Sequence, residues 1–444
     1  MSDPSTGDRS RRAVLAACGA GMAALAGCSS VGIRSDGDDE PAYDRGRVDE
    51  IARKEVPTRP DAFPVTVTDG MVARHYDRAR DLLDAVPSRP TVPNGAITKR
   101  LRDMREAVAT AVPDPGSDEN VDRRGPERLG RPRHVRADAA ELLGAYRAAT
   151  GEMDPEWVAD RREGLRSDLR AFEREWTYRG SDPADALVVH AELEGYRDRV
   201  RRSAEAWPPV PDDPVAAPLD VGEIVRGVEA GRATLADATR LRERYLTELE
   251  DPRPFRSTMT VAAHRMHRRS SFAGRRIEEY ARGGPDDLPF DRSLEGTPAI
   301  HFFDELQADV RHEGENADED RRAGNHASAT LSSARRLAGV RAFETVFDGI
   351  EAGKYGTPED ADRVAAARAA ALEALQAAWE TTPVPLSVDV TFPAHDAFRW
   401  GHRKLDGSRG ASSAVNEALA SFVYARLYAE EVPAVVDTVQ NVLE

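Results

Sequence analysis

The sequence predicts an all-α protein, or nearly so, built of antiparallel helical hairpins packed as one or two bundles. Apolar residues recur at steps of three and four through most of the chain, as Val72, Tyr76 and Ala79 do. Aromatic residues make up only 6% of the chain and alanine is abundant, which suits a core of Ala, Leu and Val. The sequence has no Gly-rich dinucleotide turn, no P-loop and no alternating β–α rhythm, and this disfavours a two-lobed solute-binding protein.

Helices are predicted along the first half of the chain wherever this periodicity runs without interruption. The predicted segments are 72–86, 96–112, 134–150, 155–178 and 183–207. Their boundaries carry residues that start or stop helices: Pro87, Pro113, Gly151, Asp154-Pro155 and Asp182-Pro183. The segment 114–133 lacks periodicity and is predicted to be a surface loop.

The proline-rich segment 208–214 is predicted to separate two helical bundles, an N-terminal one at 47–207 and a C-terminal one at 215–444. The second bundle is expected to contain the helices 221–250, 255–282, 297–311, 327–351, 358–379, 411–430 and 433–443. The stretch 313–320 is rich in Asp and Glu and is predicted to be a solvated acidic loop. Asp318 and Asp320 alternate there, but no glutamate-terminated calcium loop follows.

A minor β element and an internal repeat are two further expectations. Leu386, Val388 and Val390 alternate within 383–393, which predicts a short strand that pairs with the similar stretch 63–68. The phrase at 227–232 recurs at 349–354, each time with glycine where a helix C-cap is expected, as in the turn of a repeated hairpin. The alternative for the repeat is coincidence.

The N-terminal segment carries an export and anchoring pattern. Arg11 and Arg12 precede the apolar run 13–26, which is shorter than the roughly 20 residues that span a bilayer, and the run ends in Leu-Ala-Gly-Cys at Cys28. The paired arginines resemble a twin-arginine signal, and residues 25–28 resemble a lipobox. The whole segment is therefore similar to those of haloarchaeal lipoproteins that are exported by the twin-arginine pathway. The alternative is a plain apolar tail.

This resemblance implies a signal peptide at 1–27, followed at 28–46 by a lipidated Cys28 and an acidic tether. The lipid would hold the protein on the outer face of the cytoplasmic membrane without a spanning helix. The only other cysteine, Cys18, lies in the segment that would be removed. The mature chain would therefore have no disulfide.

The composition bears on the salt concentration in which the protein works and on whether it binds nucleic acid. The formal charge is −16, and only four of the 62 basic residues are lysine. An acidic chain with so little lysine resembles the proteins of extreme halophiles, although a GC-rich genome would give a similar bias. Phosphate recognition needs a clustered basic face on a basic domain, so nucleic acid is not expected as a partner.

One segment of this acidic chain is itself strongly basic. Between 253 and 282 eight arginines stand against Glu278 and Glu279. The candidate face for an anionic partner consists of Arg265, Arg268, Arg269, Arg275 and Arg276. It would suit anionic headgroups, an acidic polymer or a protein partner at the membrane surface. The alternative is internal pairing with the acidic stretch 304–320.

Histidines supply the only candidates for metal or acid–base chemistry. His264 and His267 are three residues apart on a predicted helix, and His301 and His312 follow among Asp304, Glu305 and Asp309. Neighbouring arginines repel a cation, so structural or surface histidines are favoured. His395 and His402, with Asp396 and Trp400, form a second set that an ordinary helix start after Pro393 explains better.

The sequence therefore predicts a membrane-anchored extracytoplasmic lipoprotein with a binding or scaffolding role. No catalytic residue, metal site or cofactor is assigned. The chain also lacks the cysteines and haem motif of an electron carrier. The alternatives are a metal-assisted surface hydrolase that uses His264 and His267, and an accessory subunit of a membrane transporter complex.

Overall fold

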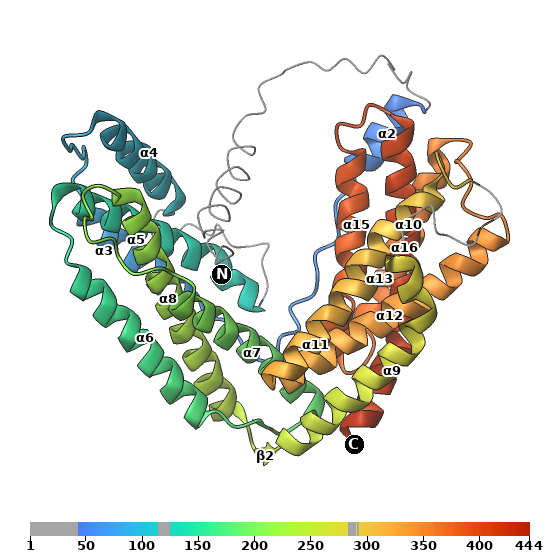
Figure 1. The fold of residues 1–444 in the computed structure, drawn as a ribbon. Helices are drawn as coiled ribbons and strands as arrows, with labels where there is room; N and C mark the ends of the chain where they lie inside the picture. The colour runs from blue at the N-terminus through green and yellow to red at the C-terminus, as the bar shows by residue number, and fades with distance from the viewer. Residues whose placement is uncertain (1–42, 114–124, 283–289, 291–292) are drawn as a thin grey trace, which may run out of the picture.

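The structure is a computed structural model that describes residues 43–113, 125–282, 290 and 293–444. Within these residues the chain is almost entirely helical, with one very small sheet, which confirms the all-α prediction. The helices form two arms that open from a common base, like a V (Figure 1). Among the described helices, none is long and apolar enough to cross a membrane.

The N-terminal arm contains the helices that follow the first crossing of the chain. They are α3 (Asp69–Asp84), α4 (Gly95–Ala111), the 3-10 turn η1 (Gly125–Leu129), α5 (Gly130–Thr150), α6 (Pro155–Glu175), α7 (Pro183–Glu205) and α8 (Pro218–Glu248). Asn94, Asp154 and Asp182 cap α4, α6 and α7 through side-chain oxygens that accept backbone N–H groups. The N-caps of α6 and α7 are those that the sequence predicts.

The C-terminal arm contains the rest of the chain together with its first helix. Its helices are α2 (Arg45–Ala52), α9 (Arg256–Arg282), α10 (Pro298–Leu306), the π-helical turn η3 (Gln307–His312), α11 (Glu313–Ala323), α12 (His326–Glu351), α13 (Ala361–Trp379), α14 (Val384–Val390), α15 (Phe392–Leu405) and α16 (Ser412–Leu443). Val48 and Ile51 bury α2 against this arm, so the segment 53–68 crosses from one arm to the other (Figure 1).

Each arm has its own hydrophobic cluster, and the change of cluster does not fall at 208–214. Helix α8 follows that proline-rich segment, yet it packs closely on α5 inside the N-terminal arm. The close approach depends on Gly144 and Gly222, because a Cβ at Gly222 would lie 2.8 Å from the carbonyl oxygen of Glu141. The chain leaves this cluster after Leu249, just before β2 (Arg253–Pro254).

Helix α7 belongs to both clusters and joins the arms. Its first turns bury Leu187 and Val188 in the C-terminal cluster, and its later turns bury Leu193 and Val200 in the N-terminal cluster. A helix that is apolar on two sides in this way is buried between two layers. The two arms are therefore packed together at the base of the V. We call this region, where α7 contacts both arms, the joint.

The predicted strand at 383–393 is wrong. Residues 384–390 form α14, whose Leu386, Val388 and Val390 are buried, and 63–68 form no strand. A short apolar run can be buried equally well as helix or strand, so alternation over seven residues does not decide between them. The sheet consists instead of β1 (Arg179–Gly180) and β2, which pair antiparallel.

Two smaller expectations are also corrected. The acidic stretch 313–320 is helix α11, in which Glu313 and Glu315 occupy the first turn and Arg321 and Arg322 the last, an order that favours the helix dipole. Gly231 lies inside α8 and caps nothing, whereas its counterpart Gly353, with φ of 78°, follows the end of α12. The similar phrases therefore occupy different structures.

Candidate functional site

A cleft of about 900 Å³ lies between the two arms along α7. Helix α7 presents Glu192, Gly195, Asp198, Arg199 and Arg202 to it. These residues follow one another at steps of one and three, which places them along one side of the helix. Residues 59–63 of the crossing segment also line the cleft.

The opposite wall comes from the C-terminal arm. Asn316, Glu319, Asp320 and Ala323 repeat at steps of three and four along α11 and face α7 across the cleft. Both signs of charge are represented in the lining. The arginines are Arg59, Arg133, Arg199, Arg201, Arg202 and Arg335. The carboxylates are Asp61, Glu127, Glu192, Asp198, Glu319, Asp320 and Asp389.

Most of these charges already have partners. Arg199 lies 3.2 Å from Glu192, Arg201 lies 2.6 Å from Glu173, and Arg335 lies 2.6 Å from Asp389. Arg59 pairs with Glu127. In the part of the chain that the structure describes, the exposed side chains of Arg202 and Glu319 make no ion pair or hydrogen bond.

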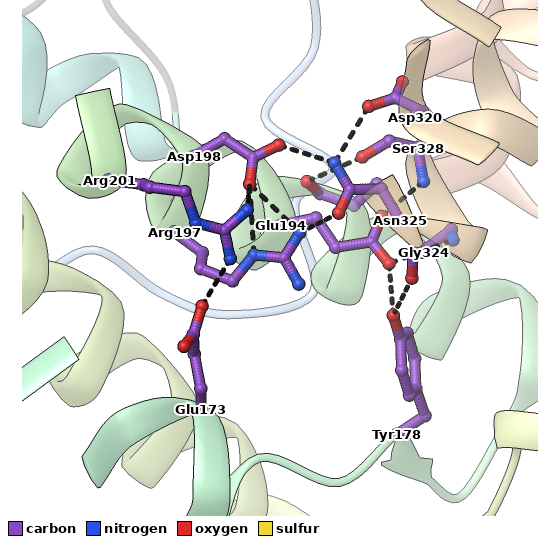
Figure 2. Close-up of polar contacts among 12 residues, drawn as sticks. Glu173, Tyr178, Glu194, Arg197, Asp198, Arg201, Asp320, Gly324, Asn325 and Ser328 are labelled. Atoms are coloured by element: carbon purple, nitrogen blue, oxygen red, sulfur yellow. Dashed lines mark hydrogen bonds and ion pairs between the residues drawn. The ribbon is translucent and has the colours of Figure 1, made fainter. Parts of the chain in front are cut away.

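A buried carboxylate, Glu194 of α7, joins the two arms (Figure 2). Its two oxygens accept the backbone N–H groups of Ala327 at 3.2 Å and Ser328 at 2.6 Å, which lie in the first turn of α12. The Tyr178 hydroxyl donates to the same carboxylate at 2.5 Å. Glu194 therefore caps α12 from another helix, at the end where a negative charge is favourable.

Asn325 forms the second polar link between the arms (Figure 2). Its side-chain amide donates to Asp198 at 2.6 Å and to Asp320 at 3.0 Å, and its side-chain oxygen accepts from Arg197. Asp198 also lies 3.0 Å from Arg197. This network holds α7 against the turn between α11 and α12, which fixes the base of the cleft.

Burial changes the acidity of these groups. It raises the pKa of Glu194 to about 7, although its three hydrogen-bond donors oppose the rise. It raises the pKa of Asp320 to about 6, and the nearby Asp198 carboxylate adds to this effect. The pKa of His190, which lies behind the network, falls to about 4 because burial disfavours its charged form. The joint therefore contains groups that titrate near neutral pH.

The structure places the candidate anionic-partner face on the solvent side of α9. Arg265, Arg268, Arg269 and Arg275 are exposed, while the side chain of Arg276 lies outside the described residues. Internal pairing with 304–320 is not seen for these four arginines within the described part of the chain. The contact between α9 and α11 is instead made by His267, which lies 3.6 Å from Asp318.

The histidine candidates do not assemble into a site. His264 and His312 are exposed, His267 and His301 are half-buried, and the described residues contain no group of three or more His, Cys, Asp or Glu side chains arranged to hold a metal ion. His395 Nε2 lies 2.9 Å from the carbonyl oxygen of Pro57, so it ties the crossing segment to α15. Trp400 donates to Glu417.

The remaining predicted residues, Arg11, Arg12 and Cys28, lie outside the described residues. The residues of the cleft, by contrast, were missed by the sequence analysis. The polar positions of α7 and α11 carry a helical period, but a polar helix face is normally solvated, and nothing in the sequence indicates that two such faces meet.

Residues 71–251 match a family model described as a domain of unknown function (DUF8262). The matched segment runs from α3 through α8 and ends just before β2. It therefore coincides with the N-terminal arm and with the change of hydrophobic cluster. No curated protein and no solved structure matches the chain.

Proposed function

We propose that this protein is an exported, lipid-anchored binding protein that holds a polar ligand in the cleft along α7. In this proposal the signal with Arg11 and Arg12 directs export, and lipid on Cys28 keeps the protein on the outer face of the cytoplasmic membrane. The residue pattern of the N-terminal segment supports the export and the anchor. The cleft supports the binding role.

The observation that carries the binding role is a set of unpaired charges of both signs in a cleft where most charges are paired. Arg202 on α7 and Glu319 on α11 line the cleft from opposite sides without a protein partner in the described chain. Groups in this state favour a ligand that supplies the missing partners.

These features define the class of the ligand. A ligand that carries both an anionic and a cationic group would pair with Arg202 and with Glu319 at once. An apolar ligand would leave both charges desolvated without compensation. The ligand is therefore a polar molecule or polypeptide segment with charges of both signs.

Photo-crosslinking from the cleft tests the binding role. A photoreactive residue replaces Gly195, which faces the cleft, in the full chain in its own membranes at high salt. Gly164 on α6 is the control position, because a Cβ added there would have no neighbouring atom within 4 Å. An adduct of defined mass is expected at position 195 alone, and the combined change Arg202→Gln and Glu319→Gln should strongly reduce it.

The mass of the adduct distinguishes the two forms of ligand. A small increment indicates a small molecule, and a large one indicates a protein partner, such as a subunit of a membrane complex. Equal labelling from positions 195 and 164, or an adduct unaffected by the charge changes, would contradict binding in the cleft.

A further inference from the structure

Helix α9 has a second amphipathic pattern, on the side that faces away from the protein. At about 100° per residue, the eight positions 261, 264, 265, 268, 269, 272, 275 and 276 fall within an arc of roughly 140°. Val261 and Phe272 lie near the centre of this arc, and the five arginines and His264 lie on both sides of it. We call these eight positions the α9 face.

The opposite side of α9 packs into the core. Met259, Ala262, Met266 and Ile277 are buried against the C-terminal arm. Figure 1 shows α9 starting beside β2 and rising along the edge of that arm. The α9 face is therefore held in a fixed orientation by packing, and its described side chains lie outside the core.

The side chains of the α9 face that the structure describes, which are all but that of Arg276, are exposed to solvent. Phe272 is 72% exposed and Val261 43%, which makes them two of the most exposed large apolar residues in the described chain. The Arg275 guanidinium lies 4.3 Å from the centre of the Phe272 ring. Arg265, Arg268 and Arg269 are exposed and make no ion pair within the described residues.

Acidic side chains are also absent from this region of the helix. Between Arg256 and Arg275 the sequence has no Asp or Glu. The first acidic residue that follows, Glu278, pairs with Arg336 of α12. Glu279, beyond Arg276, falls at the same angle around the helix as Val261. In a chain with a net charge of −16, the α9 face is thus a local concentration of positive charge around two apolar side chains.

We propose that the α9 face lies flat on a membrane surface that carries anionic lipid headgroups. The arginines pair with headgroup phosphates, and Phe272 and Val261 enter the boundary between headgroups and acyl chains. This combination of a basic border with an apolar centre is characteristic of interfacial helices. An acidic protein surface would satisfy the arginines but would not account for the exposed Phe272.

The proposal rests on the proposed location at a membrane, but not on the lipid at Cys28 or on a ligand in the cleft. Fourteen residues separate Cys28 from Tyr43, and fully extended they reach at most about 50 Å. That is close to the length of the C-terminal arm, since the 32 residues of α16 span about 48 Å. The anchor and the α9 face can therefore contact the same membrane.

Vesicle binding of the full chain without its native cysteines tests the proposal. Cys18→Ser and Cys28→Ser remove both thiols, and His264→Cys then carries an environment-sensitive fluorophore on the α9 face. Val215→Cys, which is 52% exposed on the segment before α8, carries it in the control. Vesicles of phosphatidylglycerol and phosphatidylcholine should give a blue shift at position 264 and none at 215, and vesicles of phosphatidylcholine alone should give none at either.

Charge variants with a matched control provide the second measurement. Changing Arg265, Arg268 and Arg269 to Gln should weaken the partition coefficient about 100-fold at low salt, because each basic residue near an anionic surface contributes roughly fivefold. Changing Arg74, Arg89 and Arg100 to Gln removes the same charge from exposed positions of the N-terminal arm and should leave the partition coefficient nearly unchanged. Phe272→Ser should weaken binding in the presence of all the arginines.

Several results would overturn the proposal. Equal loss of binding in both triple variants would show that net charge, and not the α9 face, decides it. A blue shift at position 264 without vesicles, increasing with protein concentration, would show instead that the face contacts a second copy of the chain. Retention of the Cys28→Ser protein on vesicles through the α9 face would not bear on the anchor, which a separate measurement tests.

Discussion

At the scale of single residues, the joint between the arms depends on the buried carboxylate of Glu194. Burial raises its pKa in the folded protein to about 7, above the value of 4.5 for an unperturbed glutamate. The folded state therefore binds more protons than the unfolded state between these two values. The contribution of Glu194 to stability is fully present below pH 4.5 and falls as the pH rises through 7.

Replacing Glu194 by Gln should remove this dependence. The free energy of unfolding of the wild type, relative to Glu194→Gln, should fall by about 3 kcal/mol between pH 4.5 and pH 7.5. Denaturant titrations of both proteins at a series of pH values in constant salt measure this difference in the free energy of unfolding. Glu205→Gln, at an exposed position of the same helix, is the control and should run parallel to the wild type. A constant difference between wild type and Glu194→Gln across this range would contradict the assignment.

The N-terminal arm contains a second buried polar group, the pair of His75 and Asp237. Neither side chain is exposed, and His75 Nε2 lies 3.0 Å from Asp237 Oδ1. Truncation by Asp237→Ala leaves His75 and Arg133 without their buried carboxylate, so we expect a loss of about 3–5 kcal/mol in the free energy of unfolding. Asp160→Ala, at an exposed position of α6, should change it by less than about 0.5 kcal/mol. Equal effects of the two variants would show that the pair contributes little.

At the scale of helices, the close approach of α5 and α8 depends on the missing side chain at Gly222. Gly222→Ala places a Cβ 2.8 Å from the Glu141 carbonyl oxygen and 3.0 Å from the Ala145 Cβ, so the helices must separate. We expect a loss of about 1–3 kcal/mol. Gly164→Ala in α6 meets no atom and should instead stabilise the protein by roughly 0.5–1 kcal/mol, the usual gain from a helical alanine. Thermal unfolding of both variants measures the two changes in stability, which should have opposite signs. A Gly222→Ala variant as stable as the wild type would contradict the close contact.

The sequence predicts single helices well where an apolar stripe and a capping residue coincide. The helices that begin after Asp154 and Asp182 start where their N-caps indicate. Prediction fails where the same residues suit two structures. The apolar residues of 384–390 fit a strand or a buried helix, and the acidic residues of 313–320 fit a loop or a helix with a favourable dipole. Tertiary packing decides these cases.

At the scale of the whole molecule, the cleft could not be predicted because it depends on contacts between distant segments. Glu194 caps a helix whose first turn lies 134 residues later, and Asp198 meets Asn325 across 127 residues. Arg202 and Glu319 read in sequence as solvated positions of two unrelated helices. The basic segment of α9 could be recognised from its charge, but its apolar centre at Phe272 becomes evident only when the residues are placed around the helix.

The two proposed contacts with the membrane have different physical origins. Lipid on Cys28 would hold the chain through buried acyl or isoprenoid groups, which salt does not weaken. The α9 face would add charge pairing, and at molar salt the Debye length is only about 3 Å, so only arginines in direct contact with phosphate still contribute. In this proposal the anchor would dominate attachment in high salt, and α9 would determine how the molecule lies on the surface.

The central claim, a binding protein fixed to the membrane through Cys28, is tested most directly by fractionation of cells that make the wild type or Cys28→Ser. The wild type is expected in the membrane fraction after an alkaline wash, with a mature N-terminus at a lipid-modified Cys28 by mass spectrometry. The variant is expected in the soluble fraction after the same wash. A Cys28→Ser protein that stays with the membranes through the wash, or a wild-type chain that keeps Met1 to Gly27, would contradict the claim.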